Sequence, residues 1–215
     1  MNGNSGFSVP MALLDFIPVA LFFFGSLRIG KDLSKRMNTA DKLVYYWGFL
    51  YITGAGTTKA LHKLIYAVSG KNIAWMKGQF FVNQSLGFLL MGIALLYSLR
   101  LTSKSAAADG QESEESGKEY AIIPNGALVC MIIVGMCAVY SSLCKYASKL
   151  KCTKAIVMLV ISFFLYLGMG YLSSKDFDSA KMNWIAQCLN TSAQALYLLG
   201  ALMLHEAGLG KLKNE

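Results

Sequence analysis

The sequence predicts an all-α integral membrane protein with six transmembrane helices, and its composition and charge distribution support this fold class. Apolar residues make up 55% of the 215 residues, charged residues make up only 15%, and the mean hydropathy is +0.45. The charges are grouped between long runs that carry none. A soluble fold of this size cannot cover so much apolar surface with so few charges. The composition therefore excludes a disordered chain and a secreted disulfide scaffold.

The chain is also basic, with a formal net charge of +8 at pH 7. In a soluble domain this charge would suggest nucleic acid as a partner. Here the basic residues stand beside apolar runs, where they meet lipid headgroups. The pattern predicts membrane lipids as partners, no nucleic acid, and a multi-pass location in the cell membrane.

A spanning helix needs about 20 mostly apolar residues, and six segments qualify. They cover residues 11–28, 43–68, 80–101, 121–144, 155–172 and 184–204. The first segment contains Pro18. Because residues 1–10 carry no Lys or Arg, we expect it to be retained as a span rather than cleaved as a signal peptide.

The longest polar stretch divides the chain into two halves. Residues 102–120 hold five acidic residues among Ser, Gly and Ala. We interpret them as an acidic polar linker between a first three-helix half, 1–101, and a second, 121–215. An acidic tail that binds a partner is the alternative.

The two halves resemble each other when they are aligned. Gln79 matches Gln187, and Gly92 matches Gly200, both at an offset of 108 residues. If each half crosses the membrane three times, consecutive copies enter from opposite sides, which predicts an inverted repeat. The basic loops then divide almost evenly between the two faces, so the positive-inside rule only weakly favours an outside N-terminus. Chance similarity between apolar helices is the alternative.

Amide side chains lie within two of the predicted spans. On 184–204 they form one helical stripe, and on 80–101 an asparagine and a neighbouring glutamine stand near the start. Amides donate and accept hydrogen bonds, so these residues are candidates for binding a polar ligand or lining a water-filled path. Hydrogen bonding between helices is the alternative. The candidates are Asn83, Gln84, Gln187, Asn190, Thr191 and Gln194.

A basic stripe lies on segment 43–68. Lys59, His62 and Lys63 share one helical face, which suits an anionic headgroup, a carboxylate or a phosphate. Snorkelling to the headgroups is the alternative. Because side chains lean toward the helix N-terminus, we expect Lys59 to lie in a cavity with an acidic, carbonyl or ligand partner, bordered by His62. Asp15 is either a counter-ion for Lys59 or Lys63, or a headgroup-level residue.

No metal or catalytic constellation is apparent. Cys130, Cys137 and Cys144 recur every seven residues, about 10 Å apart along a helix, which is too far for one metal site. The chain has two histidines and no H-E-x-x-H or G-x-S-x-G motif. We therefore expect no metal, no cofactor, no catalytic residue and no enzymatic activity.

These observations predict a small carrier or channel-like protein that binds a small polar or anionic ligand near the bundle centre. Two other function classes stay open. One is a lipid-binding or sensor subunit that does not transport. The other is a membrane-embedded enzyme that modifies a lipid. A homodimer is compatible with each of them.

Overall fold

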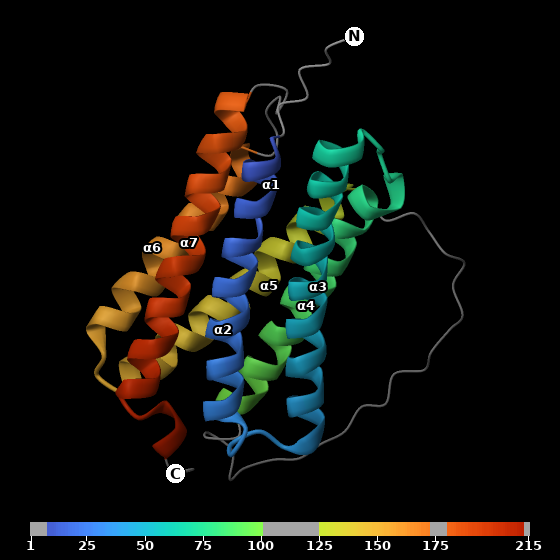
Figure 1. The fold of residues 1–215 in the computed structure, drawn as a ribbon. Coiled ribbons are helices and arrows are strands. Elements are labelled where there is room, and N and C mark those ends of the chain that lie inside the picture. The colour runs from blue at the N-terminus through green and yellow to red at the C-terminus, as the bar shows by residue number, and fades with distance from the viewer. Residues whose placement is uncertain (1–7, 101–124, 173–179, 213–215) are drawn as a thin grey trace, which may run out of the picture.

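The computed structural model describes residues 8–100, 125–172 and 180–212, and within these ranges the chain is helical with short connections (Figure 1). Each of the six predicted spans corresponds to one long helix or to a broken pair. The elements are α1 (Val9–Leu14), α2 (Phe16–Leu33), α3 (Thr39–Ser69), α4 (Ala74–Arg100), α5 (Asn125–Lys149), α6 (Thr153–Leu172), α7 (Ala180–Glu206) and the 3-10 helix η1 (Leu209–Lys211). The predicted linker, 102–120, lies outside the described residues.

The first predicted span is divided at Asp15 into α1 and α2. Pro18 explains the position of this break. Its ring occupies the place of an N–H donor and clashes with the carbonyl four residues earlier, that of Leu14. α1 ends at that residue, and the break leaves Asp15 at the junction of the two helices.

The second predicted span is longer than its apolar run suggested. α3 begins after Asn38, whose side chain accepts a hydrogen bond from the Asp41 N–H at 2.7 Å. It ends at Gly70, which adopts a left-handed φ of 68° and donates its N–H to the Tyr66 carbonyl. These two caps satisfy backbone groups that the helix ends would otherwise leave unpaired.

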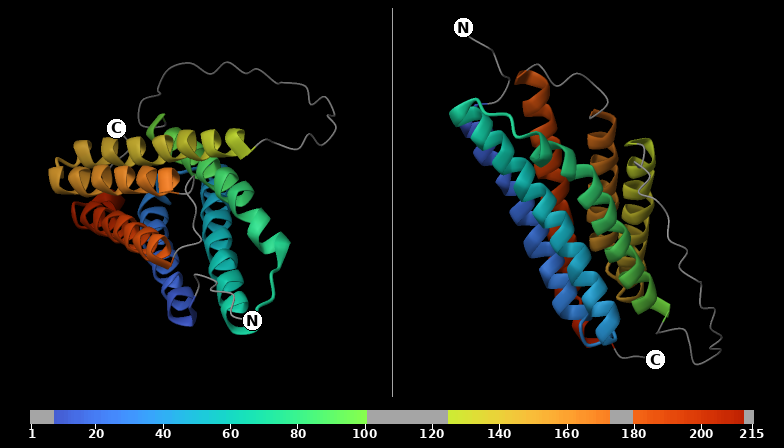
Figure 2. Two further views of the ribbon diagram at one scale, coloured as in Figure 1. Left: turned by 90° about the horizontal axis from the view of Figure 1, so that it is seen from above. Right: turned by 90° about the vertical axis from the view of Figure 1, so that its right-hand side faces the viewer.

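The six long helices form a closed ring. Each packs mainly on two neighbours, in the order α2, α3, α4, α5, α6, α7 and back to α2. The view along the bundle in Figure 2 shows α5 beside α6 on one side and α3 beside α4 on another. Segments far apart in the sequence therefore meet, because α2 packs against α7 and closes the ring.

The two halves run in the same sense, so the inverted repeat predicted from the sequence is not what this structure shows. Gly92 of α4 lies against α5 at Ala138, and further along both helices Ser98 bonds Tyr146. α4 and α5 are therefore parallel. α2 and α7 are parallel too, since Ser26 bonds Tyr197 and Asp32 bonds His205. Residue matches between the two halves do not determine the direction of the helices. The predicted direction came from the assumption that the linker begins and ends at the same face of the membrane.

This arrangement also bears on the number of membrane crossings. Because α4 and α5 are parallel, the end of α4 and the start of α5 lie at opposite ends of the bundle (Figure 1). The six helices of this ring are therefore not six consecutive spans that alternate in direction. Among the described residues, four helical segments are long and apolar enough to cross a membrane. They are Val9–Leu33, Ala74–Leu99, Gly126–Lys149 and Thr153–Leu172.

The most basic loops lie at one end of the ring, although the sequence-based topology placed them on opposite faces. The guanidinium of Arg36, in the α2–α3 connection, lies 5.9 Å from the ring centre of Tyr146, near the end of α5. The α5–α6 connection is therefore beside the α2–α3 connection. The lysines near these turns are Lys31, Lys35, Lys42, Lys145, Lys149, Lys151 and Lys154. We refer to this as the basic end.

Aromatic side chains fill the middle of the ring. Phe22 of α2 stacks on Tyr197 of α7 and meets Phe88 of α4 edge-on, with ring centres 5.5 and 6.3 Å apart. Phe88 in turn contacts Tyr166 of α6, and Tyr197 contacts Tyr140 of α5. These five residues come from five helices and form a continuous aromatic core. It separates the basic end from the opposite end, where α3 ends and α4 begins.

Candidate functional site

A cavity of about 280 Å³ lies between the aromatic core and the end opposite the basic end. All six long helices contribute to its wall. It is lined by Pro18, Val19, Phe22, Ile52, Thr53, Gly56, Lys59, Phe80, Phe81, Gln84, Val129, Ile132, Ile133, Met136, Tyr166, Leu167, Met169, Gly170, Tyr171, Asn190 and Gln194. Most of these residues are apolar, so the few polar ones define where a ligand could be held.

Lys59 supplies the charge of this cavity. Its ammonium lies 4.0 Å from the centre of the Phe80 ring, in a cation–π contact. In the described part of the chain no carboxylate forms an ion pair with it. An aromatic face attracts a cation but does not neutralise it. The cavity lining therefore carries a positive charge. The direct contact of Lys59 is an aromatic ring, and Asp15, the predicted counter-ion, attracts Lys59 without forming an ion pair with it.

Three amides accompany Lys59 in the lining: Gln84 of α4 and Asn190 and Gln194 of α7. Side-chain hydrogen bonds join the Tyr166 hydroxyl to both glutamines. Gln194 is only 3% exposed, and its Oε1 atom has no partner among the described residues. The amides of α4 and α7 thus meet across the ring through a tyrosine, and one enclosed amide oxygen has no partner in the described part of the chain.

Glycines bring the helices together around this cavity. A Cβ on Gly56 of α3 would meet Val19 Cγ2 of α2 at 2.9 Å, and both residues line the cavity. Deeper in the ring, a Cβ on Gly48 would lie 2.7 Å from the Gly87 carbonyl of α4. Such close approach allows backbones to pack directly. Gly54, by contrast, is exposed with open space around it, so the small-residue run 54–58 contacts protein only in part.

The other members of the predicted basic stripe lie outside this lining. Lys63 forms an ion pair with Asp15, and both side chains are largely buried. His62 hydrogen-bonds the Asn72 side-chain oxygen at 3.1 Å. The helix break at Asp15 places its carboxylate within reach of Lys63. The stripe therefore divides into an internally paired part, Lys63 with Asp15, and Lys59 in the cavity.

Three predicted amide or hydroxyl candidates are also absent from the lining. Asn83 donates to the Gln79 side chain one turn earlier on α4. Gln187 is buried, and its Nε2 atom has no partner within the described ranges. Thr191 is half-buried on α7. Asn83 therefore makes a contact within α4, and all three positions lie outside the cavity that holds the other candidates.

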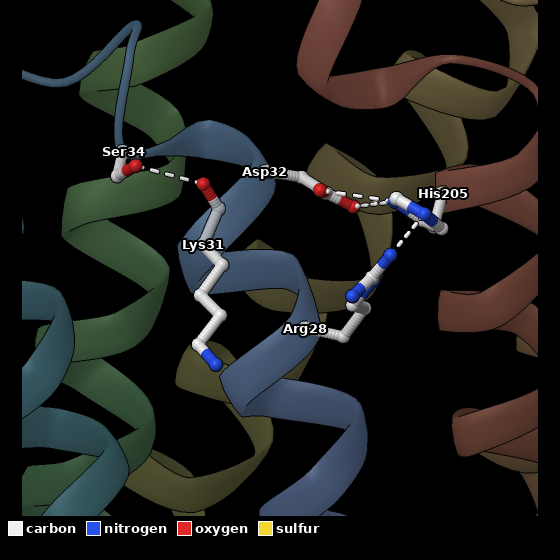
Figure 3. Close-up of polar contacts among 5 residues, drawn as sticks. All are labelled: Arg28, Lys31, Asp32, Ser34 and His205. Carbon is white, nitrogen blue, oxygen red and sulfur yellow. Dashed lines mark hydrogen bonds and ion pairs between the residues drawn. The ribbon is translucent and has the colours of Figure 1, made fainter.

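A second polar cluster ties α2 to α7 at the basic end (Figure 3). His205 Nδ1 lies 2.9 and 3.0 Å from the two carboxylate oxygens of Asp32, and Arg28 contacts His205 Nε2. An imidazole that donates from Nδ1 to the carboxylate accepts from the guanidinium at Nε2. The same view shows the Ser34 hydroxyl donating a hydrogen bond to the Lys31 carbonyl at the end of α2. This cluster closes the ring where α2 and α7 end.

Sequence reasoning did not select Tyr166, Phe80 or the Asp32–His205 pair. The sequence did carry one signal for Tyr166. It is a tyrosine inside an apolar run, and its hydroxyl needs a polar partner when it is buried. Phe80 carried no such signal, since its role depends on which helix faces α3. Asp32 and His205 are 173 residues apart, and only the α2–α7 contact brings them together.

Within the described residues, no group of three His, Cys, Asp or Glu side chains is placed to hold a metal ion. Comparison of the chain with protein-family models, with curated proteins and with solved structures found no match. The cavity and its residues are therefore the features that indicate a function.

Proposed function

We propose that this chain is a multi-pass protein of the cell membrane that binds a small anionic ligand in the cavity around Lys59, and that it acts as a carrier for that ligand. The observation that supports this most directly is the Lys59 ammonium, which lies in a 280 Å³ cavity whose lining, among the described residues, holds no carboxylate. Asp15 attracts this ammonium from outside the lining but forms its ion pair with Lys63. A charge in an apolar setting is costly without a counter-charge, and a bound anion supplies one.

The neighbouring amides favour the same kind of ligand. Gln84, Asn190 and Gln194 line the same cavity and supply amide groups beside the charge. An amide N–H donates a hydrogen bond to a carboxylate or phosphate oxygen and so orients the anion. No step in this proposal breaks a covalent bond, so the protein acts by binding rather than by catalysis.

The aromatic core explains why the ligand would be carried rather than conducted. Phe22 and Tyr166 line the cavity and belong to the aromatic core, so the cavity is closed toward the basic end. Passage to that end requires these rings to move, which is the defining step of alternating access. A lipid sensor without transport would need the same site but no such movement.

Thermal unfolding in phosphatidylcholine nanodiscs tests the binding site. Acetate, succinate, glycerol 3-phosphate and octanoate would be added separately to the wild-type protein, to Lys59→Gln and to Lys63→Gln. We expect at least one anion to raise the Tm of the wild type and of Lys63→Gln, but not that of Lys59→Gln. Lys63 is the comparison position, because it lies on the same face of α3 but outside the cavity lining.

Two results would overturn the proposal. One is the absence of any anion-dependent shift in the wild type. The other is an equal shift in Lys59→Gln. Counterflow of the stabilising anion in proteoliposomes then separates a carrier from a sensor: a carrier exchanges labelled anion across the bilayer, whereas binding without exchange leaves only the sensor.

A further inference from the structure

The cavity is amphipathic in a way that narrows the ligand class. Its charge and amides come from α3, α4 and α7, as Lys59, Gln84, Asn190 and Gln194. The α5 part of the wall consists of aliphatic and methionine side chains, with none that can hydrogen-bond strongly. A hydrophilic anion would leave this second wall without a partner, whereas an apolar chain would cover it.

The exposed lining residues indicate where the cavity opens. Val129 and Ile133 of α5 are 41% and 40% exposed, Phe81 of α4 is 38% exposed, and Tyr171 of α6 is 65% exposed. These apolar and aromatic side chains both line the cavity and face outward. In a membrane bundle, outward-facing apolar residues meet acyl chains. The mouth therefore opens to the hydrocarbon between α4, α5 and α6.

We propose that the ligand is a single-chain amphipathic anion, a carboxylate or phosphate carrying one apolar chain, which enters from the bilayer. Its head lies at Lys59, and its chain runs along Ile133 and Val129 toward the mouth. This inference rests on the proposed function, because it requires the same anion site. It adds that the apolar part of the ligand contributes to binding and that access is lateral.

Photolabelling measures where the apolar chain of a bound ligand lies and how much that chain contributes to binding. The probe is a medium-chain carboxylate with a diazirine near its methyl end, added to the protein in phosphatidylcholine nanodiscs. Octanoate, acetate and octylammonium compete in separate arms. We expect octanoate to displace the probe at a concentration at least tenfold below that of acetate, and octylammonium to displace little. Adducts should map to α5 and α6, near the mouth.

Unspecific partitioning of the probe into the bilayer is the same for every variant. Two pairs of variants therefore control for it. Lys59→Gln should lower labelling at least tenfold, and Lys63→Gln should not. Gly170→Leu should also lower labelling, because Gly170 is an exposed lining residue and a side chain added there narrows the mouth without displacing the helix. Gly54→Leu is the matched control, since Gly54 also has open space but lies outside the lining.

The outcomes separate this inference from the proposed function. If acetate and octanoate compete equally and both depend on Lys59, the anion site stands and the amphipathic ligand is wrong. If Gly54→Leu and Gly170→Leu lower labelling equally, the chain does not lie in this cavity, and the inference is wrong again. If labelling is the same in Lys59→Gln as in the wild type and no anion shifts the Tm, both proposals fail.

Discussion

Most buried hydroxyl groups in this ring have a hydrogen-bond partner, so a buried polar atom without one is informative. Tyr45 donates to the Ser26 carbonyl at 2.7 Å, and Tyr140 bonds Ser162 at 2.8 Å. Where nearly all such groups are satisfied, an unpaired buried polar atom marks either instability or a place for something else. Gln194, whose Oε1 has no partner among the described residues, and Lys59 both line the cavity, which favours a ligand there.

At the residue scale, His205 should stabilise the closed ring. We predict that His205→Ala lowers the free energy of unfolding by about 1–3 kcal/mol, because it leaves the Asp32 carboxylate without its hydrogen bond. Glu206→Ala is the control, since the neighbouring Glu206 is exposed. Thermal unfolding in detergent measures both. Equal stability of the two variants would show that this cluster contributes nothing to the α2–α7 contact.

Two positions expected from the sequence agree with the structure, namely Lys59 in a cavity and Asp15 beside a lysine, whereas their role in binding stays a prediction. Lys59 could be assigned to a cavity because helical side chains point back toward the N-terminus, and Asp15 could be paired with a lysine because both lie near one end of the bundle. The partners of Lys59 and Gln194 could not be predicted. They depend on Phe80 and Tyr166, whose positions follow from how helices rotate and pack, which spacing within one helix does not determine.

At the element scale, apolar runs and proline chemistry account for most of the fold. All six predicted spans overlap long helices, and the Pro18 break lies inside the first. Helix direction in the second half was wrong, because the prediction assumed that residues 102–120 begin and end at one face. Parallel α4 and α5 require contacts such as Ser98 with Tyr146, which local sequence does not reveal.

The contact between α4 and α5 predicts a strong response to a small substitution. A Cβ on Gly135 would lie 2.6–2.8 Å from Phe88 and Leu89 backbone or Cβ atoms, so the two helices would have to separate. We predict that Gly135→Ala costs about 1–3 kcal/mol of stability, the usual range for overpacking. The measurement is thermal unfolding of the purified protein.

Gly126→Ala is the matched control for Gly135→Ala. Both glycines belong to α5, and a Cβ on Gly126 meets open space. We expect this variant to be as stable as the wild type, or slightly more stable, because alanine restricts the unfolded chain. If Gly135→Ala is as stable as Gly126→Ala, α4 and α5 do not pack as closely as the structure shows.

At the scale of the whole molecule, the ring concentrates basic residues at one end. The α2–α3 and α5–α6 turns share that end, as the Arg36–Tyr146 contact shows. If the protein spans the cell membrane as proposed, the positive-inside rule predicts that this end faces the cytoplasm. The cavity lies toward the opposite end, so its anion would be met from the outer half of the bilayer.

Site-directed labelling tests this topology. In a background without the native cysteines, Lys35→Cys and Ser148→Cys report on the two basic turns, and Lys71→Cys reports on the opposite end; all three positions are exposed. In intact cells, a membrane-impermeant maleimide should label only Lys71→Cys. After permeabilisation it should label all three. Labelling of Lys35→Cys and Ser148→Cys from opposite sides would restore the alternating six-span topology.

Reversing the charge of Lys59 tests the central claim, that this ring encloses an anion site, most directly. The measurement is the photolabelling yield with two probes of equal chain length, one a carboxylate and one an ammonium, in the wild type and in Lys59→Glu. The account predicts that the carboxylate probe labels the wild type in preference to the ammonium probe and that Lys59→Glu inverts this preference. Equal labelling of both proteins by the carboxylate probe would contradict it.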